Sequence, residues 1–202
     1  MTEQEWMACS DPEKMLEFLR GRVSDRKLRL CSVACFRKNW HLLTYQRIRD
    51  AVVVLERYAD EMAGDSELSD AALWVAAAKW QVPGGDARIA AFRFAKVIAS
   101  PLSWDSVIEV AWSFSSPQLM HDIFGNPFRP VAINPTWLAW NDGTVLRIAL
   151  SIYDERSFDR MPILADALED AGCDNEELLC HCRSEGPHVR GCWAVDLILR
   201  KE

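Results

Sequence analysis

Apolar residues recur at intervals of three and four along most of the chain, the spacing that places them on one face of an α-helix. Ser24 is a typical N-cap, and the apolar stripe after it consists of Leu28, Cys31, Cys35 and Leu42. Thr44 can cap a second helix, and Gly64 stands where a C-cap glycine is expected. The stripe of this second helix consists of Ile48, Val52, Leu55, Ala59 and Met62. The pattern therefore predicts two long amphipathic helices, at 24–43 and 44–62.

The other predicted helices are recognised by the residues at their ends. Asp11 followed by Pro12 is a typical helix start, as is Asn175, and Gly172 marks an expected helix end. On this basis further helices are predicted at 11–20, 70–80, 86–99, 101–114, 116–124, 144–155, 161–172, 176–183 and 192–200. The β-branched and aromatic content of 101–114 leaves a strand open there.

No long alternating strand pattern and no glycine-rich phosphate loop are found in the sequence. The chain is therefore predicted to be all-α, a multi-helix bundle or orthogonal helical array of roughly nine to ten helices. The segment 125–135, GNPFRPVAINP, interrupts the pattern with three prolines, a glycine and two asparagines. We expect an N-terminal helical half at 1–124 and a C-terminal half at 136–202, joined by this loop, although both halves can share a single core.

Charge is distributed unevenly along the 202 residues. The net charge of −7 argues against generic binding to nucleic acids or membranes. Residues 20–57, however, hold ten basic and three acidic side chains, and residues 154–177 hold nine acidic side chains and two arginines. This opposition permits either docking of the two segments within the molecule or an anionic partner for the basic one.

The sequence also suggests where the protein works. The acidic N-terminus lacks the basic and apolar regions of a signal peptide, and no apolar run approaches the ~18 residues that span a bilayer. Seven cysteines, an odd number, favour reduced thiols over a disulfide framework. We therefore expect a cytoplasmic protein with no membrane partner.

Reactive side chains are concentrated in the segment 173–193, which holds four cysteines and two histidines. His188 and Cys192 are four residues apart and would share one face of a helix. Cys173, Cys180, His181 and Cys182 can supply one or two further ligands, and the preferred set is Cys173, Cys182, His188 and Cys192. The cofactor is therefore either zinc or none, because buried free cysteines are also common in ordinary cores.

A surface for a macromolecular partner is the second kind of candidate site. The basic segment could contact several phosphates of a nucleic acid, and the 125–135 loop could bind a protein or insert Phe128 between helices. The candidate partner-binding residues are Arg22, Arg26, Lys27, Arg29, Arg37, Lys38, Phe128 and Arg129. Another protein is the expected partner, nucleic acid is an alternative, and no small molecule is indicated.

Catalytic signatures are weak throughout the chain. No local nucleophile motif surrounds a cysteine, and carboxylates such as Asp166 and Glu169 fit the solvated face of a helix. We therefore expect a non-enzymatic helical module for protein interaction or regulation, stabilised by a Cys/His metal site if one forms. The alternatives are a nucleic-acid-binding protein that uses residues 20–57 and a metal-dependent enzyme.

Three strings together resemble one protein family: GNPFRPV at 125–131, YDERSFDRMPILADALEDAGCDNEELLCHCR at 153–183 and GPHVRGCWAVDLILRKE at 186–202. The opening EWMACSDPEKMLEFLRGRVSDRKLRL is similar to the N-terminal region of the same family, a large group of uncharacterised planctomycete paralogues. The resemblance covers both ends of the chain and leaves 65–115 as a variable middle. It implies no activity, and association with repeat or regulatory domains favours an interaction role. The family is richer in cysteine near 31–36, where Phe36 follows Cys35 here, which argues against a metal site on the first helix pair.

Overall fold

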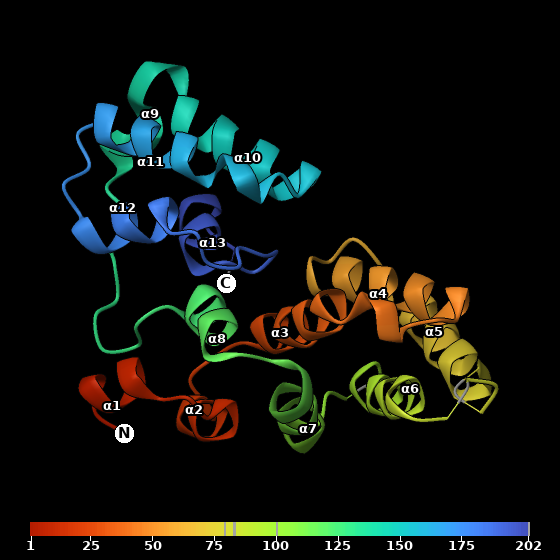
Figure 1. Ribbon diagram of the computed structural model, residues 1–202. Helices are drawn as coiled ribbons and strands as arrows, with labels where there is room; N and C mark the ends of the chain where they lie inside the picture. The colour runs from red at the N-terminus through yellow and green to blue at the C-terminus, as the bar shows by residue number, and fades with distance from the viewer. Residues whose placement is uncertain (79, 83, 100, 202) are drawn as a thin grey trace. The chain divides into compact units, whose positions relative to one another are not determined.

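The computed structural model describes residues 1–78, 80–82, 84–99 and 101–201 (Figure 1). Within these ranges the chain forms thirteen α-helices and three short 3₁₀-helices, and none of the described residues lies in a β-strand. The all-α prediction is confirmed, and the open case at 101–114 is a helix. The predicted count of nine to ten helices is wrong. The helices α1 (Glu3–Ala8) and α9 (Pro135–Ala139) have six and five residues, too few to show a helical period, although Asn134-Pro135 is a typical helix start and Asn134 does cap α9.

The helices form two compact units. Unit 1 consists of Met1–Ala8 and Gln118–Glu202, and unit 2 consists of Cys9–Pro117. The sequence favoured a division at the 125–135 loop, but this loop lies inside unit 1. The N-terminal helix α1, expected in the N-terminal half, also belongs to unit 1. In the sequence, unit 2 is thus one continuous segment, with one part of unit 1 before it and the other part after it.

Unit 2 is built around one buried helix. Its helices are α2 (Pro12–Leu19), α3 (Asp25–Lys38), α4 (Gln46–Ala59), α5 (Asp65–Ala78), α6 (Asp86–Val97) and α7 (Trp104–Phe114). Residues 28–36 of α3 are all buried, and α3 packs against α4, α6 and α7. Near its C-terminal end, Phe36 packs edge-on against Phe94 of α6 at 4.9 Å between ring centroids. A helix buried on every side is the natural centre of such an array.

The helix ends of unit 2 follow the sequence in part. Asp11 and Ser24 act as the predicted N-caps, accepting hydrogen bonds from the backbone N–H groups of Glu13 and Lys27. By contrast, Thr44 does not cap α4, whose N-cap residue is Tyr45. Gly64 does not end α4 either. Its carbonyl accepts from the backbone N–H of Leu68, so it begins α5 instead.

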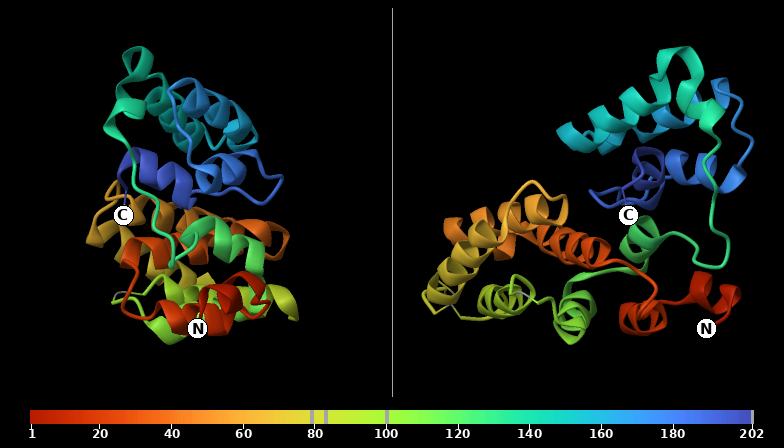
Figure 2. Two further views of the ribbon diagram at one scale, coloured as in Figure 1. Left: turned by 90° about the vertical axis from the view of Figure 1, so that its left-hand side faces the viewer. Right: turned by 180° about the vertical axis from the view of Figure 1, so that it is seen from behind.

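Unit 1 contains helix α1 and the helices of the C-terminal part. These are α8 (Pro117–Phe124), α9, α10 (Thr144–Glu155), α11 (Met161–Asp170), α12 (Glu176–Arg183) and α13 (Trp193–Leu199). Helices α10 and α11 lie side by side in Figures 1 and 2. The core between them and α13 includes Ile152, Leu168 and Ile198, all with no exposed surface. Both chain termini lie in this unit.

Helix α1 is fastened to α8 and the loop after it. Trp6 is fully buried, and its indole Nε1–H donates to the carbonyl of Gly125 at 3.0 Å. The indole also packs edge-on against His121 of α8, with 5.6 Å between ring centroids. Glu3 accepts from the side chains of Asn126 at 2.8 Å and Arg129 at 2.6 Å. The first residues of the chain therefore hold α8 and the 125–135 loop in place.

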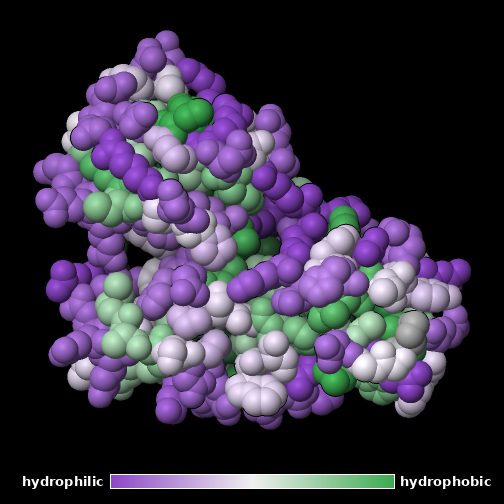
Figure 3. Space-filling model, viewed as in Figure 1, coloured by the Kyte–Doolittle hydropathy of each residue, from purple (hydrophilic) through white to green (hydrophobic). Residues whose placement is uncertain are grey.

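On the face shown in Figure 3, hydrophilic residues predominate and hydrophobic ones lie between them. The largest exposed apolar side chains are concentrated in unit 2, where Trp80 and Trp112 have 67% and 66% of their surface exposed. Trp6 of unit 1, by contrast, is fully buried. No helix in the described ranges has the length and apolar character needed to cross a membrane.

We predict that Trp6→Ala destabilises unit 1 by about 3–5 kcal/mol, because it leaves a cavity and removes the hydrogen bond to Gly125. Trp112→Ala, at an exposed position, is expected to change stability by less than about 0.5 kcal/mol. Urea unfolding followed by circular dichroism measures both changes. Equal losses from the two variants would contradict the anchoring role of Trp6.

Candidate metal centre

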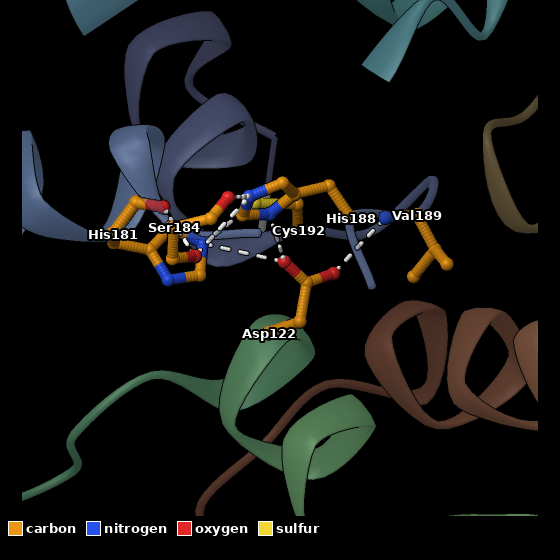
Figure 4. A network of polar contacts seen from close by, with 6 residues as sticks. All are labelled: Asp122, His181, Ser184, His188, Val189 and Cys192. Atoms are coloured by element: carbon orange, nitrogen blue, oxygen red, sulfur yellow. Dashed lines mark hydrogen bonds and ion pairs between the residues drawn. The ribbon is translucent and has the colours of Figure 1, made fainter. Parts of the chain in front are cut away.

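Four potential metal ligands meet within unit 1: Asp122, His181, His188 and Cys192 (Figure 4). One ligand atom from each residue lies within 4.8 Å of all the others. Asp122 belongs to α8, His181 to the last turn of α12, and Cys192 is the N-cap residue of α13. His188 lies in the segment that connects α12 with α13. Three elements and a loop therefore converge on one point.

Local sequence chemistry explains how α12 and its following loop present their ligands. Asn175 caps α12 by accepting from the backbone N–H of Leu178 at 2.9 Å, as predicted. The helix ends at Ser184, whose hydroxyl and backbone N–H both donate to the carbonyl of His181. Gly191 has φ +96°, a conformation that favours glycine, and the next residue is Cys192. The chain thereby turns back and returns the thiol to the imidazole of His181.

The distances between ligand atoms are short. Asp122 Oδ1 lies 2.7 Å from His188 Nδ1 and 3.3 Å from His181 Nε2. His181 Nε2 in turn lies 3.1 Å from Cys192 Sγ. The second carboxylate oxygen, Asp122 Oδ2, accepts from the backbone N–H of Val189 at 3.0 Å. Asp122 is therefore the central residue of the cluster.

The carboxyl group of Asp122 is ionised although it is almost completely buried. Its exposed fraction is 2%. Burial alone would raise its pKa, but the hydrogen bonds and charges of His181 and His188 outweigh burial and lower the pKa below its ordinary value of 3.8. The site thus holds a desolvated negative charge that requires cationic partners.

In the metal-free structure His188 supplies one of these cationic partners. Burial acts to lower its pKa, but the hydrogen bond and charge of Asp122 together raise it above the ordinary value of 6.5. Its Nε2 lies 3.2 Å from the carbonyl of Ser184 while its Nδ1 faces Asp122. Acceptors at both ring nitrogens are satisfied together only by the protonated imidazolium, since the neutral ring has a single N–H.

The thiol of Cys192 is protonated when no cation is bound nearby. Burial first, and then the negative charge of Asp122, raise its pKa well above the ordinary value of 9.0. A bound metal ion would reverse this preference, because coordination deprotonates a thiol. The same ion would displace the proton between His188 Nδ1 and Asp122, leaving Nε2–H donating to Ser184. That outer hydrogen bond is the type that orients a metal-ligating histidine.

The spacing of the donors is close to that of a tetrahedral metal site. Zinc bonds of about 2.0–2.1 Å to nitrogen or oxygen and about 2.3 Å to sulfur give tetrahedral edges of about 3.3 Å and about 3.6 Å respectively. The separations of 3.3 Å between Asp122 and His181 and 3.1 Å between His181 and Cys192 are near these edges, whereas the 2.7 Å between Asp122 and His188 would have to lengthen when a metal ion binds. This buried Asp/His/His/Cys group can therefore hold a metal ion.

The same residues do not form a catalytic Cys–His–Asp relay. In such a relay the thiol and the carboxylate contact opposite nitrogens of the imidazole. Here Cys192 and Asp122 both face Nε2 of His181. The thiol has no exposed surface, and its pKa is raised rather than lowered. A cysteine hydrolase, weighed from the sequence, is therefore not supported by this geometry.

The structure brings together two of the four metal ligands preferred from the sequence. His188 and Cys192 lie in the cluster, but not on one helical face, because the segment before Cys192 is not helical. Cys173 and Cys182 are not among the four residues and lie in the apolar core of unit 1. Burial raises the pKa of Cys182 to about 12. Its thiol is therefore that of an ordinary core residue.

Cys173 has a separate structural role at the end of α11. Gly172, with φ +85°, and Cys173 donate their backbone N–H groups to the carbonyls of Glu169 and Leu168. This pair of hydrogen bonds is a Schellman motif, in which the residue after the glycine packs back onto the helix. Cys173 is 4% exposed and shares the core with Leu168. Its burial thus follows from helix capping.

Two ligands were not selected from the sequence. His181 is one of the further ligands that the sequence allows but not one of the preferred set, and in the structure neither Cys180 nor Cys182 is its partner. Asp122 is not among the metal ligands predicted from the sequence. The sequence does indicate that Asp122 is buried, because it is next to Ile123 and three residues after Leu119, on the apolar face of α8. A carboxylate on such a face needs a partner, but the sequence does not say which.

The basic segment 20–57 does not form an open cationic face. Arg26 pairs with Asp60 at 3.0 Å, and Arg37 pairs with the buried carboxylate of Glu56. Arg29 is itself buried, with its guanidinium 5.0 Å from the centroid of the Tyr58 ring. Among the other candidates in this segment, Arg22 and Lys38 are exposed and Lys27 is half-buried. Much of the positive charge is therefore neutralised within unit 2.

The 125–135 loop is an ordered segment of unit 1. Phe128 is 36% exposed, so it is not a fully buried plug between helices. Its backbone N–H donates to the side chain of Asn126, which tightens the loop. Arg129, the other candidate here, contacts Glu3 of α1. Gly125, with φ +62°, lies against the indole of Trp193, which an added Cβ would approach to 3.0 Å.

Comparison of the chain with models of protein families, with curated proteins and with solved structures finds no match. What the protein does is therefore argued from the geometry of its own residues.

The metal-free protein is predicted to be most stable between about pH 4 and about pH 6.5. Asp122, with its lowered pKa, stabilises the fold above about pH 3.8, and this contribution is lost as the pH falls through the folded-state value. His188, with its raised pKa, stabilises the fold below about pH 6.5, and this contribution is lost as the pH rises through the folded-state value. Urea unfolding of chelator-treated protein across this range measures the effect.

His188→Gln should remove the part of this dependence above about pH 6.5 and cost about 1–3 kcal/mol at pH 5.5. His41→Gln in unit 2 is the matched control and is expected to leave the profile unchanged. An unaltered profile in the His188 variant would show that the Asp122–His188 pair does not set the pH dependence.

Proposed function

We propose that this protein is a non-enzymatic helical module for protein interaction or regulation, and that zinc bound by Asp122, His181, His188 and Cys192 stabilises its unit 1. The observation that carries the metal part is the convergence of four buried donor atoms within 4.8 Å of one another. A metal ion bound there would cross-link α8, α12 and α13.

The chemistry of the donors favours zinc among the biological metals. One thiolate, two imidazoles and one carboxylate form a mixed sulfur, nitrogen and oxygen set, whereas calcium and magnesium take oxygen ligands. Asp122 and a deprotonated Cys192 would together supply two negative charges, which balance a divalent cation. The carbonyl of Ser184 lies 3.2 Å from His188 Nε2, where it would accept the outer hydrogen bond of a metal-ligating histidine.

Four protein donors favour a structural role for the ion. Catalytic zinc sites usually keep one coordination position for water or substrate, whereas structural sites are closed by four protein ligands. Cys192 has no exposed surface, and the side chains of Asp122 and His188 are 3% and 6% exposed. A metal-dependent enzyme, the alternative from the sequence, would need an open position. The cavity of about 390 Å³ that His188 borders would be the place to find it.

The interaction role is supported by the exposed aromatic residues of unit 2. Trp74, Trp80 and Trp112 have 40%, 67% and 66% of their surface exposed. Tryptophan is enriched at protein interfaces because it buries a large rigid area when a partner binds. These residues lie on or beside α5–α7, away from the predicted basic segment in the sequence.

We predict one zinc ion per chain in protein purified without chelator or affinity-tag metal. Asp122→Asn, His181→Ala, His188→Ala and Cys192→Ser should each abolish stoichiometric zinc, because each removes one of four ligands. Elemental analysis and a thiol titration measure occupancy and the protection of Cys192. A melting temperature that falls on chelation would show that the ion stabilises the fold.

Two controls separate this ligand set from the set preferred by sequence. Cys180 is exposed and Cys173 is buried, and neither belongs to the cluster. Cys180→Ser and Cys173→Ser should both retain zinc. Loss of zinc from the Cys173 variant with full retention in the Cys192 variant would refute the assignment. Protein without zinc, and with no change in stability on zinc addition, would refute the metal proposal itself.

Zinc binding is further expected to release protons, since the ion replaces the proton of the His188 imidazolium and that of the Cys192 thiol. Calorimetry at pH 6 in buffers of different ionisation enthalpy should yield between one and two protons per zinc. In His188→Gln the number should fall by about one in any residual binding. A number near zero in the unaltered protein would contradict the proposed protonation states.

A nucleic-acid-binding role remains the alternative from the sequence, and it has a direct test. Arg22→Glu and Lys38→Glu reverse exposed charges without breaking the ion pairs of Arg26 and Arg37. A salt-dependent shift of DNA or RNA by the unaltered protein, abolished in this double variant, would favour that role. No shift at low salt would exclude it.

A further inference from the structure

Arg29 of α3 is a buried cation, and one of its guanidinium nitrogens has no hydrogen-bond partner in the described structure. Its exposed fraction is 5%, and its Nη1 is buried with no hydrogen-bond partner. Its neighbours Arg26 and Arg37, by contrast, pair with Asp60 and Glu56. The aromatic face of Tyr58, 5.0 Å from the guanidinium carbon, cannot replace an acceptor at Nη1. A guanidinium does not escape this situation by losing its proton.

The guanidinium side chain forms part of the wall of a cavity within unit 2. The cavity has a volume of about 420 Å³, and it is bounded by α3, the end of α4 and the start of α5. Its size is at the lower end of the range for small-molecule sites. A ligand with an acceptor group in this cavity would lie beside the Arg29 side chain, and the enclosed Nη1 would have to turn toward the cavity to donate to it.

The start of α5 adds a second feature that favours an anionic group. Gly64 and Asp65 line the cavity, and Asp65 is the first residue of this fourteen-residue helix. The N–H groups of a first helical turn have no acceptor within the helix, and they carry a partial positive charge. Arg29 and this helix terminus are thus two positive features on the same cavity.

The rim of the cavity has the opposite charge. Asp25, Glu61 and Asp65 line it and are all exposed. Asp65 accepts a hydrogen bond from the hydroxyl of Tyr58 at 2.8 Å, and Asp60 already neutralises Arg26. The exposed rim of the cavity therefore has more carboxylates than positive charges, whereas Arg29 is buried. A simple anion such as phosphate would be repelled by this rim, whereas a molecule with one charge of each sign fits both parts.

We propose that this cavity binds a small zwitterion that carries a carboxylate and an ammonium group, as free amino acids do. The carboxylate receives hydrogen bonds from Arg29, since a guanidinium matches a carboxylate with two parallel N–H···O bonds. The ammonium group faces Glu61 and Asp25 at the rim. The site lies wholly within unit 2 and does not depend on the proposed zinc site of unit 1.

Binding is tested on the full chain with each of the twenty standard amino acids, and with acetate, methylammonium and inorganic phosphate as separate probes. Isothermal calorimetry measures the affinity, and a rise in melting temperature confirms binding to the folded state. At least one amino acid should bind with at least a tenfold lower Kd than acetate, methylammonium or phosphate. Phosphate binding more tightly than any amino acid would overturn the proposal, as would no binding by any amino acid.

Variants of the wall and of the rim should act in different directions. Arg29→Met should abolish amino-acid binding without lowering the melting temperature of the ligand-free protein, because it removes a buried guanidinium whose Nη1 has no hydrogen-bond partner. Arg29→Lys keeps the charge but not the paired donors, and should weaken binding at least tenfold. Glu61→Gln should weaken amino-acid binding but strengthen the binding of acetate, because one repulsive rim charge is removed.

Lys38→Met is the matched control, since it removes an exposed positive charge from the same helix. It should leave the amino-acid Kd within a factor of two. Unchanged binding in both Arg29 variants would refute the role of Arg29. Equal losses in the Arg29→Lys and Lys38→Met variants would show that only long-range charge acts on the ligand.

Discussion

A single buried carboxylate constrains the arrangement of unit 1. Asp122 lies on the apolar face of α8, where an ionised group is stable only if charges or hydrogen bonds surround it. His188 and the backbone of Val189 supply them from one loop, and His181 supplies another from α12. Because α8 must present this carboxylate accurately, its own position matters, and Trp6 of α1 fixes it from the other end of the chain.

If a metal ion binds as proposed, the cluster has two states that differ in which cation neutralises the carboxylate. Without metal, the cation is the imidazolium of His188, and the thiol of Cys192 keeps its proton. With metal, one divalent ion would replace both protons and contact all four side chains. The protein can therefore keep much of its local geometry in either state. The difference between the two is the number of bonds that join α8, α12 and α13.

Local signals in the sequence predicted the helices well and the site only partly. Asp11, Ser24 and Asn175 act as the caps that their residue types indicate, since capping depends on neighbours two or three positions away. His188 and Cys192 were identified because they lie close together in the sequence. Asp122 is 66 positions from His188, and no local pattern reports such a pairing. The partners of a buried charge are set by tertiary packing.

The boundary between the two units differs from the predicted one at the 125–135 loop for a similar reason. The prolines at 127, 130 and 135 correctly indicated an irregular segment, yet irregular backbone does not by itself separate two cores. Trp6 and Trp193 contact the start of this loop, at Gly125, from opposite ends of the chain. Such contacts cannot be inferred from loop composition. The same holds for the basic segment 20–57. Helix packing brings Glu56 to Arg37 and Asp60 to Arg26, and the sequence alone does not show these ion pairs.

The interruption of unit 1 by unit 2 determines the order in which the chain can acquire its structure during synthesis. Residues 9–117 leave the ribosome as an uninterrupted segment and can fold while the C-terminal part is still being made. Helix α1 is made before unit 2 but must wait for Gly125 before Trp6 gains its hydrogen bond. Cys192 follows Asp122 by 70 positions in the sequence. The contacts of Trp6 and of the ligand cluster can therefore form only after residues 9–117 have been made, and α1 lacks its partner at Gly125 throughout that interval.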